Sequence, residues 1–249
     1  MTVEAPRRRL RGRQPDPKYM TFIEHLQELR QRLIVSIAAI AVGSVVGWFL
    51  APRTIHLLIQ PLRHAFPHQP PVVFQVYGAF TLQLKIAIII GFMIALPVTL
   101  YQLWGFLAPA FGRGANLWAP LWIGSALLLF AAGAATGFFV VPLALKFFSN
   151  FQGDVQVIPN ASDYVSFLAL ILIVFGISFE LPLVVVSLSA VGLVSSRALA
   201  AKRLHAFFGC FIFSTIATPG ADLVSPIILG AILYVLYELG VLVSRLIGK

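Results

Sequence analysis

The sequence has little charge and only one cysteine. Of its 249 residues, 11% are charged and 59% are hydrophobic, and the mean hydropathy is +0.91, which excludes an ordinary soluble domain. Cys210 has no partner for an internal disulfide and is expected to pack as a small buried hydrophobe. The apolar runs are continuous, whereas the strands of a β-barrel alternate apolar and polar residues. Several runs approach the roughly 20 residues that a helix needs to cross a bilayer, so the sequence predicts an all-α polytopic membrane protein.

Positive charge is concentrated before the first apolar run. The net charge is +9, and the basic residues of the tail, residues 1–19, are Arg7, Arg8, Arg9, Arg11, Arg13 and Lys18. We expect this tail to be disordered, to hold the N-terminus in the cytoplasm and to contact anionic lipid rather than nucleic acid. A polar helix separates the tail from an apolar run that is too long for a signal core, so a cleaved secretory signal is not expected.

We predict one membrane domain over residues 20–249 with six transmembrane helices. The predicted spans are 33–51, 82–104, 117–141, 164–194, 206–219 and 223–243. The last two are short, since 206–219 rises only about 21 Å as a helix. With this topology, 14 of the 18 Lys and Arg residues lie on the side of the N-terminus, which places both termini in the cytoplasm.

The stretch at residues 54–79 is expected not to span the membrane. It contains four prolines and a short extended-looking run at residues 72–77, and it should form a structured cap outside the cytoplasm. His64 and His68 have the spacing of helical metal ligands, but Pro67 interrupts any helix that would place them on one face. No metal or cofactor is therefore expected.

A short amphipathic helix precedes the first span. Thr21 and Glu24 have the spacing of a capping box, which predicts that the helix begins at about Phe22. Glu28 lies four residues before Arg32, and a pair at this spacing on a helix surface contributes only a few tenths of a kcal/mol. The spacing alone leaves open whether Glu28 is part of an ordinary ion pair or of a binding site.

Carboxylates also occur inside the predicted spans. Glu180 stands near the middle of the fourth span and must face a cavity or a partner, or stay protonated between helices. Asp222 is expected to cap the start of the last helix, and Glu238 lies late in it.

Two other function classes compete at this stage. A proton-coupled small-solute transporter would use Glu180 as its proton site, but the sequence shows no inverted internal repeat. An intramembrane enzyme would need a nucleophile or metal motif, and none is present.

Six short motifs occur together in the chain. They are HLQELRQRL at residues 25–33, QPL at 60–62, YQLWGFLAP at 101–109, FGISFELP at 175–182, TPGAD at 218–222 and ELG at 238–240. In the order and spacing of these motifs the chain resembles TatC, the C subunit of the twin-arginine protein translocase. The resemblance implies a six-helix, glove-shaped scaffold in the cytoplasmic membrane that is not an enzyme. It would receive folded proteins that carry a twin-arginine signal peptide and export them with the protonmotive force.

The resemblance also implies roles for individual residues and partners. Glu28, Arg30 and Phe106 would form the signal-peptide site, and a guanidinium pairs with a carboxylate in a way that lysine cannot reproduce. Five further residues would matter for structure or function: Pro61, Glu180 facing the concave interior, Thr218, Asp222 and Glu238. Single-span subunits of the TatA and TatB type would dock against the last two helices of an oligomeric complex.

Two positions depart from the pattern of that family. Ala115 stands where relatives commonly carry a second glutamate that contacts the signal. Glu24, one turn before Glu28, is a candidate for the missing charge, although its capping role is favoured. Pro226 stands where relatives often have a polar glutamine.

Overall fold

The computed structural model describes residues 22–112, 114–150, 158–218 and 224–247. In these ranges the chain is built from helices, and a single isolated bridge pairs Val72 with Asn160. The helices are α1 Phe22–Ala65, α2 Gly78–Phe111, α3 Ala115–Ser149, α4 Ala161–Phe179, α5 Leu181–Ala190, α6 Ser196–Ala201, α7 Arg203–Ala217 and α8 Val224–Leu246. The predicted all-α class is confirmed.

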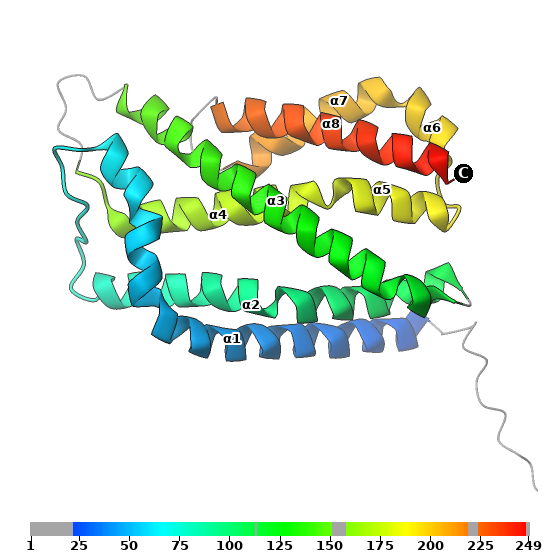
Figure 1. Cartoon of the computed structure of the whole chain (residues 1–249), viewed down its shortest axis with the longest axis horizontal. Helices are drawn as coiled ribbons and strands as arrows, with labels where there is room; N and C mark the ends of the chain where they lie inside the picture. The colour runs from blue at the N-terminus through cyan, green and yellow to red at the C-terminus, as the bar shows by residue number, and fades with distance from the viewer. Residues whose placement is uncertain (1–21, 113, 151–157, 219–223, 248–249) are drawn as a thin grey trace, which may run out of the picture.

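Helix termini gather at the two ends of the molecule's long axis. Figure 1 shows that α2, α4, α5, α8 and the first part of α1 run roughly along the long axis, while α3 crosses them obliquely. The start of α1, the α2–α3 connection, the start of α7 and the end of α8 all lie at the right-hand end of this view. The C-terminal part of α1 and the start of α4 lie at the other end.

Five helical segments are long and apolar enough to cross a membrane. They are 23–65, 78–111, 115–149, 161–190 and 224–246. Helix α7 is apolar but has only 15 residues, about 22 Å of rise. Helix α8 has 23 residues and is not short as we predicted, because it continues beyond the predicted end at residue 243 to Leu246. The number of spans and the side on which the termini lie stay predictions.

Helix α1 differs from the prediction at its C-terminal end. The chain stays helical through residues 54–65, where the sequence predicts the start of a non-spanning cap. Pro52 and Pro61 lie inside the helix, and a proline removes one backbone hydrogen bond and bends a helix without ending it. Figure 1 shows the cyan C-terminal part of α1 turned sharply away from the blue N-terminal part. Beyond α1, the predicted extended run forms only the bridge at Val72.

The core forms where the helices approach closely. Its fully buried side chains include Ile86 on α2, Val141 on α3 and Phe175 on α4. Helices α1 and α2 meet backbone to backbone, since a Cβ on Gly43 would lie 2.6 Å from the carbonyl oxygen of Gly91. Small residues at such crossings allow membrane helices to pack tightly, and this packing holds the start of α1 against the end of α2.

Candidate functional site

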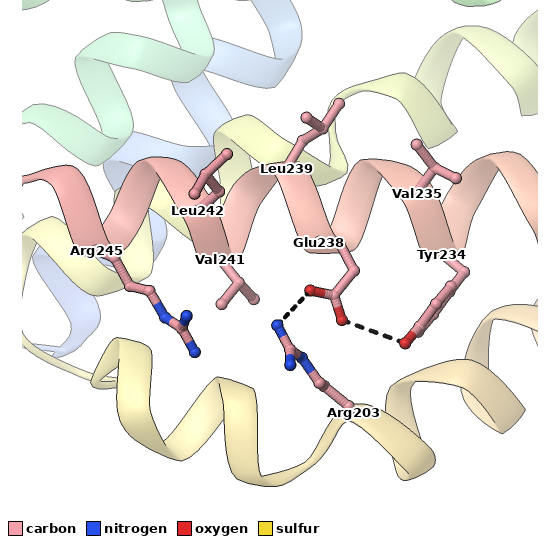
Figure 2. Close-up of a pocket in the computed structure, with 8 residues that line it drawn as sticks. All are labelled: Arg203, Tyr234, Val235, Glu238, Leu239, Val241, Leu242 and Arg245. Carbon is pink, nitrogen blue, oxygen red and sulfur yellow. Dashed lines mark hydrogen bonds and ion pairs between the residues drawn. The ribbon is translucent and has the colours of Figure 1, made fainter.

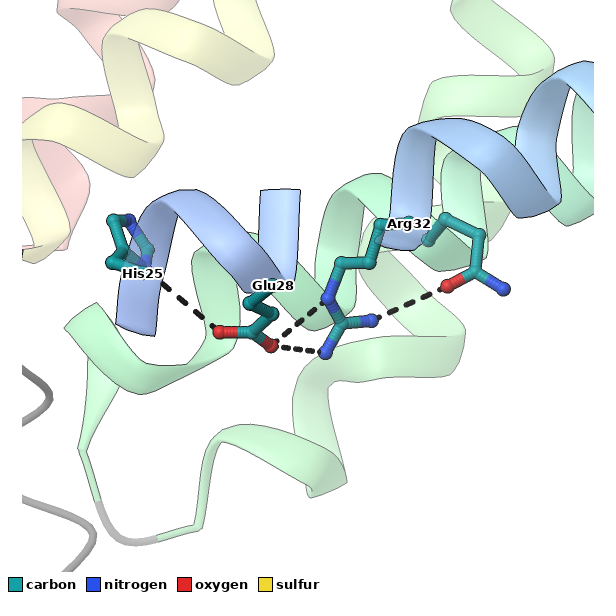
Figure 3. Close-up of polar contacts among 4 residues, drawn as sticks. His25, Glu28 and Arg32 are labelled. Carbon is teal, nitrogen blue, oxygen red and sulfur yellow. Dashed lines mark hydrogen bonds and ion pairs between the residues drawn. The ribbon is translucent and has the colours of Figure 1, made fainter. Parts of the chain in front are cut away.

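Glu28 lies in the second turn of α1 and is paired with Arg32 one turn later. Nε and Nη2 of Arg32 donate to Oε1 of Glu28 at 2.9 and 2.5 Å, which confirms the predicted pair (Figure 3). Nη1 of Arg32 donates to Oε1 of Gln102 on α2 at 3.4 Å. The guanidinium therefore links the carboxylate of α1 to the neighbouring helix.

Helix α2 accommodates this guanidinium through a glycine. A Cβ on Gly105 would lie 2.6 Å from Cζ and 2.8 Å from Nη2 of Arg32, closer than van der Waals contact permits. The next residue, Phe106, stacks on the ring of His25 with centroids 4.2 Å apart and planes 14° from parallel. One turn of α2 thus supplies both the flat surface beside Arg32 and an aromatic face for the His25 ring.

The second oxygen of the Glu28 carboxylate is left without a hydrogen bond. Among the described residues, Oε2 has no donor although the atom is buried, and the side chain as a whole is 20% exposed. Nδ1 of His25 is 3.8 Å away, beyond hydrogen-bonding distance (Figure 3). A buried carboxylate oxygen without a donor is costly, so this arrangement favours a ligand with N–H donors and positive charge.

The structure brings only some of the predicted signal-site residues together. Phe106 stacks on His25, whose Nδ1 lies 3.8 Å from Oε2 of Glu28. Arg30 is exposed and makes no ion pair with another described residue. Ala115, the first residue of α3, is buried and brings no charge. Thr21 lies outside the described residues, so the capping box stays a prediction.

Sequence reasoning did not single out Gln102 and Gly105. They are three residues apart on α2, with Phe106 one residue further, so all three share one helix face. That spacing is a signal that the sequence contains. The sequence does not specify the register that sets this face against Arg32. Arg32 and Gln102 are 70 residues apart in the chain.

Glu180 lies at a break in the membrane helix. It is the single residue between α4 and α5, and Pro182 occupies the first turn of α5. Oε1 of Glu180 is buried and has no hydrogen-bond partner among the described residues. The carboxyl group is therefore placed to bind a donor from outside the chain or to hold a proton.

Glu238 belongs to a separate polar cluster on α7 and α8. Nη2 of Arg203 donates to Oε2 of Glu238 at 2.7 Å, and the Tyr234 hydroxyl donates to Oε1 at 3.2 Å (Figure 2). No hydrogen bond or ion pair joins this cluster to Glu28 within the described ranges. The two carboxylates therefore do not form one site.

The remaining predicted residues have local positions. Pro61 is half-buried inside α1. Thr218 ends α7, where its buried hydroxyl donates to the carbonyl of Ser214 at 2.6 Å. Asp222 lies outside the described residues, so its predicted capping role is not tested.

Comparison with known proteins places these features in one family. The family model described as Sec-independent protein translocase protein (TatC) matches residues 24–231. The TatC of Carboxydothermus hydrogenoformans is 34% identical over 234 residues, which cover 93% of this chain and 96% of that protein. The TatC of Escherichia coli K12 is also 34% identical, over 231 residues that cover 91% and 89% of the two chains.

The fold agrees with the same family. A crystal structure described as the twin-arginine translocase receptor TatC superposes with a TM-score of 0.77 at 31% identity, covering 91% of this chain and all of that one. These comparisons do not favour the alternative of a small-solute transporter that uses Glu180.

Proposed function

This chain belongs to the TatC family of Sec-independent protein translocase proteins, and on that premise we propose that it is the receptor subunit of a twin-arginine translocase. It binds the twin-arginine signal peptides of folded proteins and organises their export, driven by the protonmotive force, across the cytoplasmic membrane. Both termini lie in the cytoplasm, in agreement with the distribution of Lys and Arg. Binding and transport of this kind require no catalytic residue.

The unsatisfied oxygen of Glu28 is the observation that supports this proposal best. Its Oε2 is buried without a donor among the described residues, near the His25 ring that stacks on Phe106, at the end of the molecule where α1 begins and α8 ends. A guanidinium offers several N–H donors in one plane and also stacks on aromatic faces. An arginine of the signal that displaces the His25 ring can therefore donate to Oε2 and lie against Phe106 at the same time.

One carboxylate can serve the signal even though Ala115 replaces the usual second acid. Arg32 uses only Oε1 of Glu28, so an incoming guanidinium does not have to displace it. It must instead take the place of the His25 ring, which now covers Phe106. Arg30, exposed two residues after Glu28, is proposed to contact the signal outside this pocket.

Partner subunits have exposed apolar surface available on the last two helices. Ile216 on α7 and Ile227 on α8 are 80% and 59% exposed. We propose that single-span subunits of the TatA and TatB type dock there in an oligomeric complex, close to Thr218. Glu180 faces the interior that closes on a partner helix or on the signal.

Binding of synthetic signal peptides to the purified full-length chain tests the proposal. Glu28→Gln should weaken the binding of an Arg-Arg peptide about 10-fold to 100-fold, because a charge-assisted hydrogen bond contributes about 1.5–3 kcal/mol. The matched control is Asp163→Asn, which removes one carboxylate at the start of α4 and should leave the affinity unchanged. A Lys-Lys peptide should bind the unmodified chain more weakly than the Arg-Arg peptide.

Two outcomes would contradict the proposed site. Equal affinity of Glu28→Gln and the unmodified chain would exclude Glu28 as the receptor carboxylate. Equal binding of the Arg-Arg and Lys-Lys peptides would show that this chain does not distinguish a guanidinium from an ammonium group.

A further inference from the structure

A groove separate from the Glu28 site combines apolar walls with two arginines. It lies along α8 and the start of α7, with a volume of about 310 Å³. Arg203 of α7 and Arg245 of α8 both line it, together with Glu238 (Figure 2). Nothing in the proposed recognition of the signal uses these residues.

The two arginines retain most of their hydrogen-bonding capacity. Arg203 gives one N–H to Glu238, whereas an arginine side chain carries five. Arg245 is exposed and has no hydrogen bond or ion pair with any described residue. With one carboxylate between two guanidinium groups, the groove carries a net charge of about +1.

The two charged residues of α8 lie on one face, and the second of them is in the last turn. Glu238 and Arg245 are seven residues apart, which is two turns and about 10.5 Å along the axis. Arg245 is in the last turn of α8, and Arg203 is the first residue of the antiparallel α7. Both cations therefore lie at the same end of this helix pair, where long basic side chains reach the headgroup level of a bilayer.

The walls of the groove suit a hydrocarbon chain. Val235, Leu239 and Leu242 line it and are 58%, 47% and 53% exposed. They belong to a helix that is apolar and long enough to cross a membrane, where exposed apolar side chains suit contact with lipid. The groove thus has cationic groups at one end and an apolar strip along its length. This arrangement complements a phospholipid, which has an anionic headgroup and apolar acyl chains.

We propose that this groove binds one anionic phospholipid of the phosphatidylglycerol class. Its phosphodiester lies between Arg203 and Arg245, where the planar guanidinium groups donate to the phosphate oxygens. One acyl chain packs along Val235, Leu239 and Leu242. The single negative charge of this lipid complements the net positive groove, whereas a zwitterionic lipid brings no net charge.

Lipid titration of the delipidated full-length chain tests the proposal. Native mass spectrometry should show tighter binding of phosphatidylglycerol than of phosphatidylethanolamine with the same acyl chains. Arg245→Gln should weaken phosphatidylglycerol binding about fivefold, the effect of one cation at a membrane surface. Arg245→Lys should retain part of the affinity. Because Arg245 is exposed, the melting temperature should be the same in each variant.

The matched control is Arg197→Gln, which removes an exposed arginine of α6 that does not line the groove. It should leave lipid affinity unchanged. If Arg197→Gln weakens binding as much as Arg245→Gln, the attraction is a diffuse charge effect and the proposal is wrong. Equal binding of the two lipids would also overturn it. If Arg245→Gln keeps its lipid affinity but loses a co-purifying subunit, the groove binds an acidic protein segment instead.

Discussion

Replacing Gly43 by alanine tests how closely α1 and α2 approach each other. The added Cβ would lie 2.6 Å from the carbonyl oxygen of Gly91, 3.1 Å from its Cα and 3.2 Å from its carbonyl carbon. All three are backbone atoms, so no side chain can rotate away. Ordinary contact begins near 3.4 Å, and the helices would have to separate by about 0.8 Å, the difference between 2.6 and 3.4 Å.

The expected loss of stability follows from two opposing effects. Overpacking of a tight interface costs about 1–3 kcal/mol, and alanine recovers up to about 1 kcal/mol over glycine inside a helix. The net loss should be about 1–2 kcal/mol, which corresponds to a fall in melting temperature of roughly 3–6 °C for a chain of this size.

Gly124→Ala is the matched control for this substitution. Gly124 lies inside α3, and a Cβ there would meet no atom within 4 Å. This variant should melt at the same temperature as the unmodified chain or up to about 3 °C higher. Thermal unfolding of both variants in the same detergent measures the difference. If Gly43→Ala is as stable as Gly124→Ala, α1 and α2 do not approach each other as closely as the structure places them.

Two further predictions concern contacts between elements. Tyr164→Phe removes the hydroxyl that donates to the Leu58 carbonyl at 2.8 Å, and should lower the free energy of unfolding by about 1–2 kcal/mol; an unchanged denaturation curve would contradict this contact. Gly105→Ala should push the guanidinium of Arg32 away from α2 with little loss of stability, because the displaced group is the end of a flexible side chain. In the Gly105→Ala variant, a double-mutant cycle should give a coupling energy between Glu28 and Arg32 near zero, whereas the unmodified chain should give about 0.5 kcal/mol. An equal coupling energy in both would show that Gly105 does not position the Arg32 guanidinium.

Local spacing was sufficient to predict part of the candidate site. Glu28 and Arg32 are four residues apart on one helix, so helix geometry alone brings the two side chains within reach of each other. The break at Glu180 was also predictable, because Pro182 cannot continue the hydrogen-bonding pattern of α4. The role of Gly105 was not predictable, because a side chain there would collide with the guanidinium of Arg32, which comes from a distant part of the chain.

The length of α1 shows why element boundaries were harder to predict than element type. Proline is a strong breaker in an isolated helix, and Pro52 therefore predicted an end. In the folded chain, Ile59 and Leu62 are buried against the core, and this burial stabilises the turns beyond the proline. Tertiary packing outweighed the local penalty.

Composition and periodicity alone determined that this chain is a helical membrane protein, and its ordered motifs pointed to the TatC family. Both depend on local properties, the free energy of placing apolar residues in lipid and the geometry of a single helix. The tertiary structure decided which groups meet. Register between α1 and α2 left one oxygen of Glu28 without a donor, and the antiparallel pairing of α7 and α8 brought Arg203 to Glu238. Contacts between distant segments depend on how all the helices pack at once, and no local pattern in the sequence specifies that.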